Sequence, residues 1–187
     1  MTTTQPRIYI ASLADYNAGR LVGQWVEIGP DTDVTDLVAA ADAVLAESRE
    51  PGAEEYAVHD QDGFPSGALG EYDPLDYYAA VGAFLAAEPW QAEERLAFLS
   101  DVRSDLVGPD AQEIETAFCD AYSGTFDSAE DYARYLVEEC GDLDSIPEHL
   151  RPYFDYAAFA RDLSVDYAFV RLGGDSVGQV AVFSTVV

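Results

Sequence analysis

The sequence predicts an α+β fold, because strand-like and helix-like segments occupy different stretches of its 187 residues. Short segments rich in β-branched and aromatic residues lie near both ends of the chain. Between them, alanine-rich and leucine-rich stretches repeat their apolar residues every three or four positions, as helices do. Prolines and glycines separate these stretches, and the length suits one compact domain or two to three small ones.

The first segment, residues 1–62, is predicted to form a β-β-α-β domain. Its helix is predicted to begin at Asp33 or Thr35, since either side chain can cap a helix, and to continue until Pro51 stops it. Residues 15–19 carry asparagine and glycine, which accept positive φ, and are predicted to form a turn. The three strands are predicted at residues 7–12, 21–28 and 55–60.

The second segment, residues 63–112, is predicted to form a helical middle domain. Pro74, Pro89 and Pro109 each precede a stretch with helical periodicity. Proline is tolerated in the first turn of a helix because its missing N–H would have no intrahelical partner there. We therefore expect each of these prolines to begin a helix, the last of which continues to about Phe118.

The third segment, residues 113–187, is predicted to form a mixed α+β domain. Its best-patterned helix is expected to begin at Asp127 or Ser128 and to end at Gly141, which suits a C-terminal cap. The other predicted elements are a strand at 118–126, helices beginning at Pro147 and Pro152, and a hairpin formed by residues 167–172 and 179–183.

The charge of the chain is strongly acidic and is spread along its whole length. There are 36 acidic residues against nine basic ones, all arginines, for a net charge of −27. Residues 1–60, 61–110 and 111–187 carry −8, −8 and −11, and never more than two acidic residues are adjacent. The 49% of hydrophobic residues is too high for a disordered acidic tail. The pattern therefore indicates a folded protein with dispersed surface charge.

Such a charge destabilises a compact protein by self-repulsion, so it calls for an explanation. Composition alone leaves three explanations open: adaptation to high salt, binding to basic surfaces, and plain solubility. Duplex DNA carries about one negative charge per 1.7 Å of its axis, so 27 charges correspond to about 46 Å of duplex. This arithmetic permits DNA mimicry without establishing it.

The sequence offers few candidates for catalysis, and we predict neither an enzyme nor a metal or cofactor site. His59 and His149 are the only histidines, and His59 lies in a predicted strand, where a packed structural role is expected. No nucleophile elbow, phosphate-binding loop, zinc-binding helix or calcium loop occurs. A hydrolase that uses paired carboxylates stays open as an alternative, since two acids far apart in sequence can meet in space.

The location predicted from the sequence is cytoplasmic. The first residues lack the charged segment and apolar core of a signal peptide, and no apolar run reaches the roughly 18 residues of a membrane span. Cys119 and Cys140 are then expected to be reduced thiols.

Four segments, spaced from end to end, resemble the ArdA family of antirestriction proteins, which plasmids and transposons carry. They follow one another in the order that the family has, so the resemblance covers nearly the whole chain. Residues 61–115 are alanine-rich and depart from the family pattern. The segments are Ile8–Leu13 with Tyr16, Asn17, Gly19, Leu21, Gly23 and Trp25; Glu55–Asp60; Asp131–Gly141; and Tyr153–Leu163.

The resemblance implies a non-enzymatic inhibitor of type I restriction-modification enzymes. Such an inhibitor occupies the DNA-binding groove formed by the specificity and methyltransferase subunits, and binds neither nucleic acid nor membrane. The implied molecule is elongated, shaped like DNA and made of three small domains. Its exposed acids are expected to stand in for phosphates, and they are Asp73, Asp76, Glu88, Glu93, Glu94, Asp101, Asp105, Asp110, Glu113, Glu115, Asp127, Glu130, Asp131, Glu138, Glu139, Asp142 and Asp144.

The resemblance also implies a homodimer, paired through the C-terminal domain. Tyr122 and Phe126 are candidate interface residues, since they are aromatic side chains in the strand-like stretch of that domain. A place in the core of the domain is the alternative for both. The alternative to an inhibitor is a non-enzymatic structural or adaptor protein that is acidic because its host is adapted to high salt.

Overall fold

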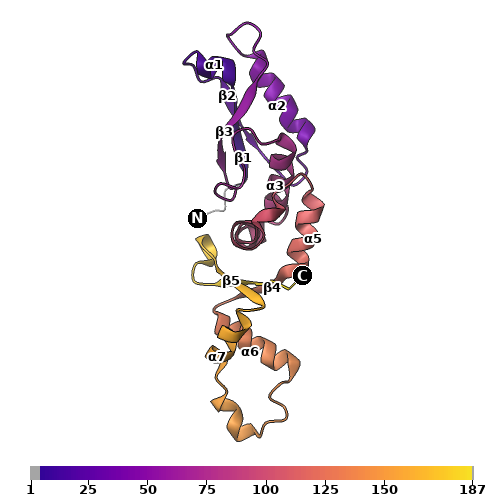
Figure 1. Cartoon of the computed structure of the whole chain (residues 1–187), viewed down its shortest axis with the longest axis vertical. Coiled ribbons are helices and arrows are strands. Elements are labelled where there is room, and N and C mark those ends of the chain that lie inside the picture. The colour runs from indigo at the N-terminus through magenta and orange to yellow at the C-terminus, as the bar shows by residue number, and fades with distance from the viewer. Residues whose placement is uncertain (1–4, 187) are drawn as a thin grey trace. The chain divides into compact units, whose positions relative to one another are not determined.

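The protein is described by a computed structural model, in which residues 5–186 are placed (Figure 1). The chain divides into two compact units, Met1–Thr116 and Ala117–Val187, which we call the N-terminal unit and the C-terminal unit. The predicted α+β class is confirmed, because each unit combines helices with one small antiparallel sheet. The predicted three-domain division is not confirmed, because residues 63–112 belong to the same compact unit as the first sheet.

The N-terminal unit contains a three-stranded antiparallel sheet in the order β2-β1-β3. Its strands are β1 (Arg7–Ser12), β2 (Gly23–Glu27) and β3 (Tyr56–Asp62), which confirms the strands predicted in this segment. The central strand has the alternation of a half-covered sheet, and Ile8 and Ile10 are fully buried.

Residues 13–17 form a short helix, α1 (Leu13–Asn17), where a turn was predicted over residues 15–19. Its beginning is stabilised by Ser12, whose side-chain oxygen accepts a hydrogen bond from the backbone N–H of Asp15. The predicted turn is confined to the residues after the helix, where Gly19 has a φ of +77°.

The predicted helix of the β-β-α-β domain is α2 (Val34–Ala46), which begins at Asp33. The carboxylate of Asp33 accepts hydrogen bonds from the backbone N–H groups of Thr35 and Asp36, and the Asp36 carboxylate accepts one from the backbone N–H of Asp33. This reciprocal cap satisfies N–H groups that the helix itself leaves unbonded. The face turned to the core carries Leu37, Ala41 and Val44.

The helices predicted after Pro74, Pro89 and Pro109 are present. They are α3 (Leu75–Ala87), α4 (Ala92–Ala97) and α5 (Ala111–Ala121), with α5 running across the boundary between the units. Three short turns complete this stretch: 3-10 turns at Pro89–Gln91 and Ser104–Leu106, and a π-helical turn at Phe98–Val102.

Close packing against Ile28 explains why a glycine lies in the middle of α3. A Cβ atom at Gly82 would lie 2.6 Å from Cγ2 of Ile28, which is closer than two carbon atoms can approach. Both residues are buried, so the bare backbone of α3 rests directly on the end of the first sheet. The helical segment and the sheet therefore share one core.

The C-terminal unit has its own three-stranded antiparallel sheet, in the order β4-β6-β5. The strands are β4 (Tyr122–Phe126), β5 (Tyr167–Arg171) and β6 (Val180–Ser184). The hairpin of β5 and β6 confirms the prediction. The strand predicted over residues 118–126 is shorter, because α5 continues to Ala121 and keeps Phe118 in a helix.

Two helices, α6 (Ala129–Cys140) and α7 (Tyr156–Leu163), pack on each other beside this sheet. Helix α6 begins at Ser128 and ends at Gly141, whose φ of +66° gives the left-handed cap that was predicted. The stretch after Pro147 forms a 3-10 helix, Glu148–Tyr153, and a further 3-10 turn lies at Gly174–Ser176.

The core of the C-terminal unit is mainly aromatic. The ring of Tyr132, which is 3% exposed, lies with its centroid 5.1 Å from that of Phe126 and 5.2 Å from that of Tyr167. Phe118 also stacks on Tyr122, with the ring centroids 5.1 Å apart. Within residues 5–186, no helix combines the length and the apolar composition that crossing a membrane would require.

Candidate acidic binding surface

Most of the acids predicted to be exposed are exposed in the structure. Asp76, Glu88, Glu93 and Glu115 are half-buried, and Glu94 is buried. The exposed ones are Asp73, Asp101, Asp105, Asp110, Glu113, Asp127, Glu130, Asp131, Glu138, Glu139, Asp142 and Asp144.

The prediction of exposure is wrong for Glu94, which is only 7% exposed. It lies in α4, a short helix that buries four of its six residues. The neighbouring Arg95 is only 1% exposed. A six-residue helix has too little periodicity for its buried face to be read from the sequence. Glu94 therefore presents little of its carboxylate to a partner.

Glu115 binds the buried arginine of the N-terminal unit. Nη1 of Arg95 donates to Oε2 of Glu115 at 2.5 Å and Nη2 donates to Oε1 at 2.9 Å, which is the two-pronged geometry that arginine and carboxylate favour. Nη1 also donates to the backbone oxygen of Phe84 at 3.0 Å, and the guanidinium lies 4.7 Å from the centre of the Phe84 ring. The charge of Glu115 thus balances a cation inside the fold and connects α4 to α5.

Several exposed acids also have a structural role. Asp110 accepts hydrogen bonds from the backbone N–H groups of Gln112 and Glu113, at the beginning of α5. Asp105 accepts from Arg103 at 2.9 Å, and this hydrogen bond holds the pKa of the Asp105 carboxyl below its usual range. Such acids stay accessible, but their geometry is set by the fold.

Helix α6 carries the densest exposed acids of the C-terminal unit, in two adjacent pairs. Glu130 and Asp131 lie in its first turn, and Glu138 and Glu139 in its last. Nη2 of Arg134, between the pairs, lies 3.5 Å from a carboxylate oxygen of Glu130. With four acids and one arginine, the helix has a net charge of −3. Over its 12 residues, or about 18 Å, this is about one charge per 6 Å. Duplex DNA is three to four times denser, at about one per 1.7 Å.

The acids continue beyond the end of α6. Asp142 and Asp144 follow Gly141, and both are exposed. Arg151 holds this loop, because its Nη2 donates to the backbone oxygen of Asp144 at 3.2 Å and its Nε donates to that of Ile146 at 3.1 Å. The loop therefore has a defined conformation in which the Asp144 carboxylate is 81% exposed.

The prediction missed exposed acids of the first sixty residues, although that segment carries −8 in the sequence. The segment of α2 presents one group of them, and the loop and strand around β3 another. Their signal was the net charge itself, which is as high as that of residues 61–110. These exposed acids are Glu27, Asp31, Asp33, Asp36, Asp42, Glu47, Glu54, Glu55 and Asp60.

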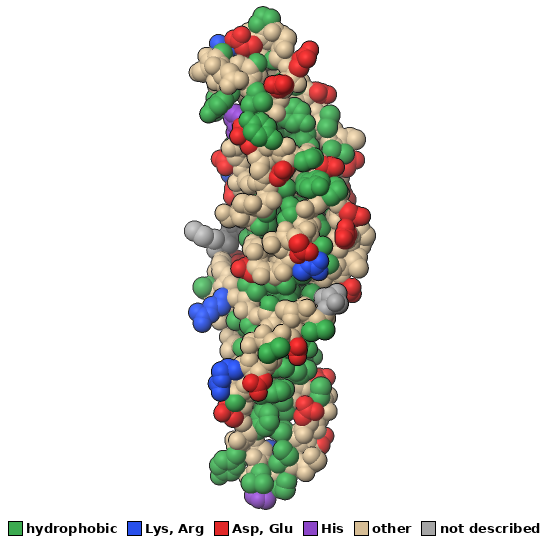
Figure 2. All heavy atoms as spheres, in the orientation of Figure 1, with side chains coloured by type: hydrophobic (Ala, Val, Ile, Leu, Met, Phe, Trp, Pro, Cys, Tyr) green, Lys and Arg blue, Asp and Glu red, His purple; other side chains and the backbone are tan. Residues whose placement is uncertain are grey.

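Figure 2 shows how the acids lie on the visible face of the molecule. They are distributed over both units and alternate with apolar and neutral side chains, and this face has no unbroken acidic stripe. By the full sequence, the N-terminal unit has 23 acidic and five basic residues, and the C-terminal unit has 13 and four. Their net charges are −18 and −9, so each unit is strongly acidic by itself.

The two candidate interface residues both pack inside the C-terminal unit. The ring of Tyr122 lies 5.6 Å from that of Phe183, and the ring of Phe126 lies 5.5 Å from that of Tyr135. Both side chains are half-buried. These contacts give Tyr122 and Phe126 a place in the domain core, while a role in pairing stays a prediction.

Among the ionisable side chains other than the acids, His59 lies in a strand and the two cysteines lie at the surface. His59 lies in β3 with its ring centre 4.6 Å from that of Tyr16, and Cys119 and Cys140 are exposed and not bridged to each other. Within residues 5–186, no group of three histidine, cysteine or acidic side chains is arranged to hold a metal ion.

The structure thus defines a class of protein: a small, strongly acidic α+β protein whose accessible ionisable groups are mainly carboxylates. The sequence profile of the antirestriction protein (ArdA) family matches residues 8–175 of the chain. The chain therefore belongs to the ArdA family. A comparison with individual curated proteins gives no match. The family match includes residues 61–115, the stretch that was predicted to depart from the family pattern.

Membership of this family implies an antirestriction function and an interaction with restriction enzymes. The exposed acids are the candidate groups of this chain for that interaction. A surface that binds DNA is basic, and carboxylates are the side chains that complement it.

Proposed function

We propose that the protein is a DNA mimic that competitively occupies the DNA-binding groove of a type I restriction-modification enzyme. One observation carries the proposal: both units of an antirestriction protein present many accessible carboxylates that no arginine neutralises. An enzyme groove that neutralises phosphates with lysine and arginine offers the complementary charge. The partner surface is then the one formed by the methyltransferase and specificity subunits.

Helix stability does not account for the acids in the last turn of α6, and this supports a role in binding. Carboxylates in the last turn of a helix lie near the negative end of its dipole, and α6 has no basic residue there. Glu138 and Glu139 therefore weaken the helix that carries them. Acids that are unfavourable for the fold and accessible to solvent are suited to a partner.

The proposal includes pairing of two chains through the C-terminal unit, in the cytoplasm of a cell that carries a mobile genetic element. A dimer doubles the accessible charge and the length of duplex that the acids replace. Sedimentation of the Tyr122→Asp variant beside the parent chain tests the pairing. Circular dichroism is the necessary companion, because Tyr122 also stacks on Phe118. A folded variant that still sediments as a dimer removes Tyr122 from the interface.

The decisive experiment is competition for a purified type I methyltransferase that contains its specificity subunits. A labelled duplex with the recognition site is bound first, and the protein is then titrated in at several salt concentrations. We expect complete displacement that weakens with added salt, although less steeply than duplex binding does, because the charge density of the protein is lower. Failure to displace the duplex at any salt concentration contradicts the proposal.

Graded neutralisation tests whether the charge is used collectively. We expect each single change, such as Asp142→Asn, to weaken displacement less than about fivefold, as loss of one exposed ion pair does. The triple change of Glu138→Gln, Glu139→Gln and Asp142→Asn should weaken it by about tenfold or more. A single substitution that abolishes displacement in a folded protein rules out distributed mimicry. The alternative of a salt-adapted adaptor predicts folding only in concentrated salt and no displacement.

A further inference from the structure

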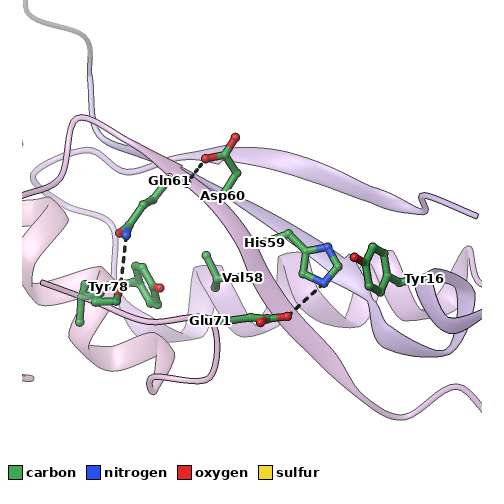
Figure 3. Close-up of a pocket in the computed structure, with 8 residues that line it drawn as sticks. Tyr16, Val58, His59, Asp60, Gln61, Glu71 and Tyr78 are labelled. Atoms are coloured by element: carbon green, nitrogen blue, oxygen red, sulfur yellow. Dashed lines mark hydrogen bonds and ion pairs between the residues drawn. The ribbon is translucent and has the colours of Figure 1, made fainter. Parts of the chain in front are cut away.

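A polar pocket of about 390 Å³ lies beside the edge strand β3 of the N-terminal unit (Figure 3). It is open to solvent, and most of its lining is polar. None of its lining side chains belongs to the acids predicted to replace phosphates. Its lining includes Tyr16, His59, Asp60, Gln61, Glu71 and Tyr78.

An irregularity in β3 shapes this pocket. Tyr9 of β1 is paired with Asp60 and the next residue, Ile10, is paired with Val58, so His59 is an extra residue in the edge strand. A bulge of this kind changes the direction of the side chains around it. Figure 3 shows the Glu71 carboxylate directed toward the His59 ring, with Tyr16 beside that ring.

The segment that returns after β3 forms one wall of the pocket and fixes the side-chain amide of Gln61. The backbone N–H of Val58 donates to the oxygen of Glu71 at 3.1 Å, and Nε2 of Gln61 donates to the oxygen of Leu69 at 3.0 Å. The second bond fixes the orientation of the Gln61 amide. Its Oε1 atom is buried, and no donor within residues 5–186 bonds to it. A buried acceptor without a donor is unfavourable, so a ligand that supplies an N–H would be favoured.

Glu71 supplies the charge of the pocket. One of its carboxylate oxygens lies 3.5 Å from Nε2 of His59, and the side chain is 44% exposed. This Nε2 atom is also buried and makes no hydrogen bond with the described part of the chain. The Asp60 carboxylate, which accepts from the backbone N–H of Gln61 at 2.8 Å, adds a second negative group at the rim. Both acids favour a cationic ligand.

Aromatic rings form two walls. Tyr16 is 57% exposed and lies at the His59 end, and Tyr78 is 1% exposed and lies at the Gln61 end (Figure 3). Burial raises the pKa of Tyr78 to about 12, and its hydroxyl donates to the oxygen of Gly70 at 2.8 Å. Tyr78 therefore stays neutral. Faces of neutral aromatic rings attract cations, and a flat guanidinium stacks on them better than an ammonium does.

We propose that this pocket receives an arginine side chain from the DNA-binding groove of the enzyme that the protein inhibits. This partner assignment rests on the function proposed above. A guanidinium has several N–H donors in one plane, so it can pair with the Glu71 carboxylate. The pocket then adds a directional contact to an interaction that is otherwise a sum of diffuse charge contacts.

The pocket can be tested without the enzyme. Nuclear magnetic resonance spectra of the full chain are recorded while acetyl-arginine-amide is added at constant ionic strength. Acetyl-citrulline-amide, which has the same shape without the charge, is the matched ligand control. We expect saturable shifts of the His59 ring and Gln61 amide signals with the arginine compound alone. Absence of saturation, or equal shifts with citrulline, overturns the proposal.

Variants locate the binding. Glu71→Gln should weaken arginine binding about tenfold, because a charge-assisted hydrogen bond is lost. Glu54→Gln removes the same charge from an exposed position of the same unit outside the pocket, and should change binding less than twofold. Equal weakening by the two variants overturns the pocket assignment. Because Glu71 is exposed, its neutral replacement is compatible with the fold.

The same two variants, used in the duplex competition, separate this inference from the proposed function. If the parent chain displaces duplex and Glu71→Gln weakens displacement severalfold more than Glu54→Gln, the pocket takes part in enzyme binding. If the two variants behave alike while the parent displaces duplex, the assigned partner is wrong and the proposed function stands. If the parent itself fails to displace duplex, the proposed function and the assigned partner both fail. The titration with acetyl-arginine-amide still decides arginine binding.

Discussion

The two units of this protein use their carboxylates in different ways. In the N-terminal unit, several acids belong to the fold: Asp15 is fully buried, Glu94 is buried, and Glu115 binds the buried Arg95. In the C-terminal unit, the core is aromatic, and no acid among its described residues is buried. A strongly acidic composition therefore combines two populations, and only the accessible one is suited to a partner.

The difference also affects how a loss of inhibition is interpreted. Neutralising an acid of the N-terminal unit can weaken inhibition by disturbing the fold, whereas neutralising an exposed acid of α6 leaves the core intact. Stability must therefore be measured beside displacement for every variant.

The aromatic core of the C-terminal unit predicts the largest effect. Tyr132→Ala removes a buried ring that contacts Phe126, Tyr167 and Phe169, and should cost about 3–5 kcal/mol of stability. Urea unfolding measures this cost, and amide exchange of β6 should accelerate. Tyr135→Ala is the matched control, because Tyr135 is 47% exposed in the same helix and should cost much less. Equal costs would contradict the assignment of Tyr132 to the core.

The buried ion pair of the N-terminal unit predicts the next effect. Glu115→Gln removes the carboxylate that accepts from both Nη atoms of the buried Arg95, which should cost about 3 kcal/mol of unfolding free energy. This is the low end for such pairs, because Glu115 is 31% exposed. Glu113→Gln, two residues away on the exposed side of α5, should change stability by less than about 0.5 kcal/mol. A silent Glu115→Gln would show that the pair is dispensable.

Asp15 predicts a pH-dependent effect. A hydrogen bond from the Ser48 hydroxyl, opposed by burial and aided by Ser12, the Arg49 backbone and Arg20, holds the pKa of Asp15 below its usual value near 3.9. A carboxyl with a lowered pKa in the folded state stabilises the protein above its unfolded-state pKa. That contribution is lost as the pH falls through the folded-state pKa.

The parent chain should therefore melt at a higher temperature than Asp15→Asn at pH 6, and the difference should shrink below about pH 4. Comparison with Asp42→Asn, an exposed acid of the same unit, removes the general effect of net charge. A difference that is constant from pH 6 to pH 2 would show that Asp15 acts through packing and not through its charge.

The smallest effect has opposite signs at the two ends of α6. Glu139→Gln removes a negative charge from the last turn and should stabilise the protein by about 0.3–1 kcal/mol. Glu130→Gln removes one from the first turn, where it also contacts Arg134, and should destabilise the protein by a similar amount. Thermal unfolding at low salt resolves both. If Glu139→Gln destabilised the chain, the claim that this acid is unfavourable for its helix would be wrong.

Much of the secondary structure was predictable because its signals are local. Pro74 and Pro89 precede helical segments as expected, and the Asp33 and Gly141 caps are residues whose chemistry defines helix ends. The exception near the start is instructive. Residues 15–19 have turn composition, yet the Ser12 side chain caps a short helix over most of that stretch.

What the sequence did not predict depends on contacts between distant residues. The buried Arg95 pairs with Glu115, which is twenty positions further along the chain. The bulge at His59 is a mismatch between two strands, so neither strand shows it alone. The division at residue 62 was not confirmed because α3 rests on Ile28, a contact that glycine permits and that composition does not reveal.

That contact also bears on how this protein can change over evolution. Its surface acids are many, so we expect most of them to be exchangeable one at a time with little consequence. Gly82 has no such freedom, because an added methyl group would occupy the space of Ile28 and move α3 away from the sheet. We therefore expect homologues to vary widely in their acids and to retain glycine at the position of Gly82.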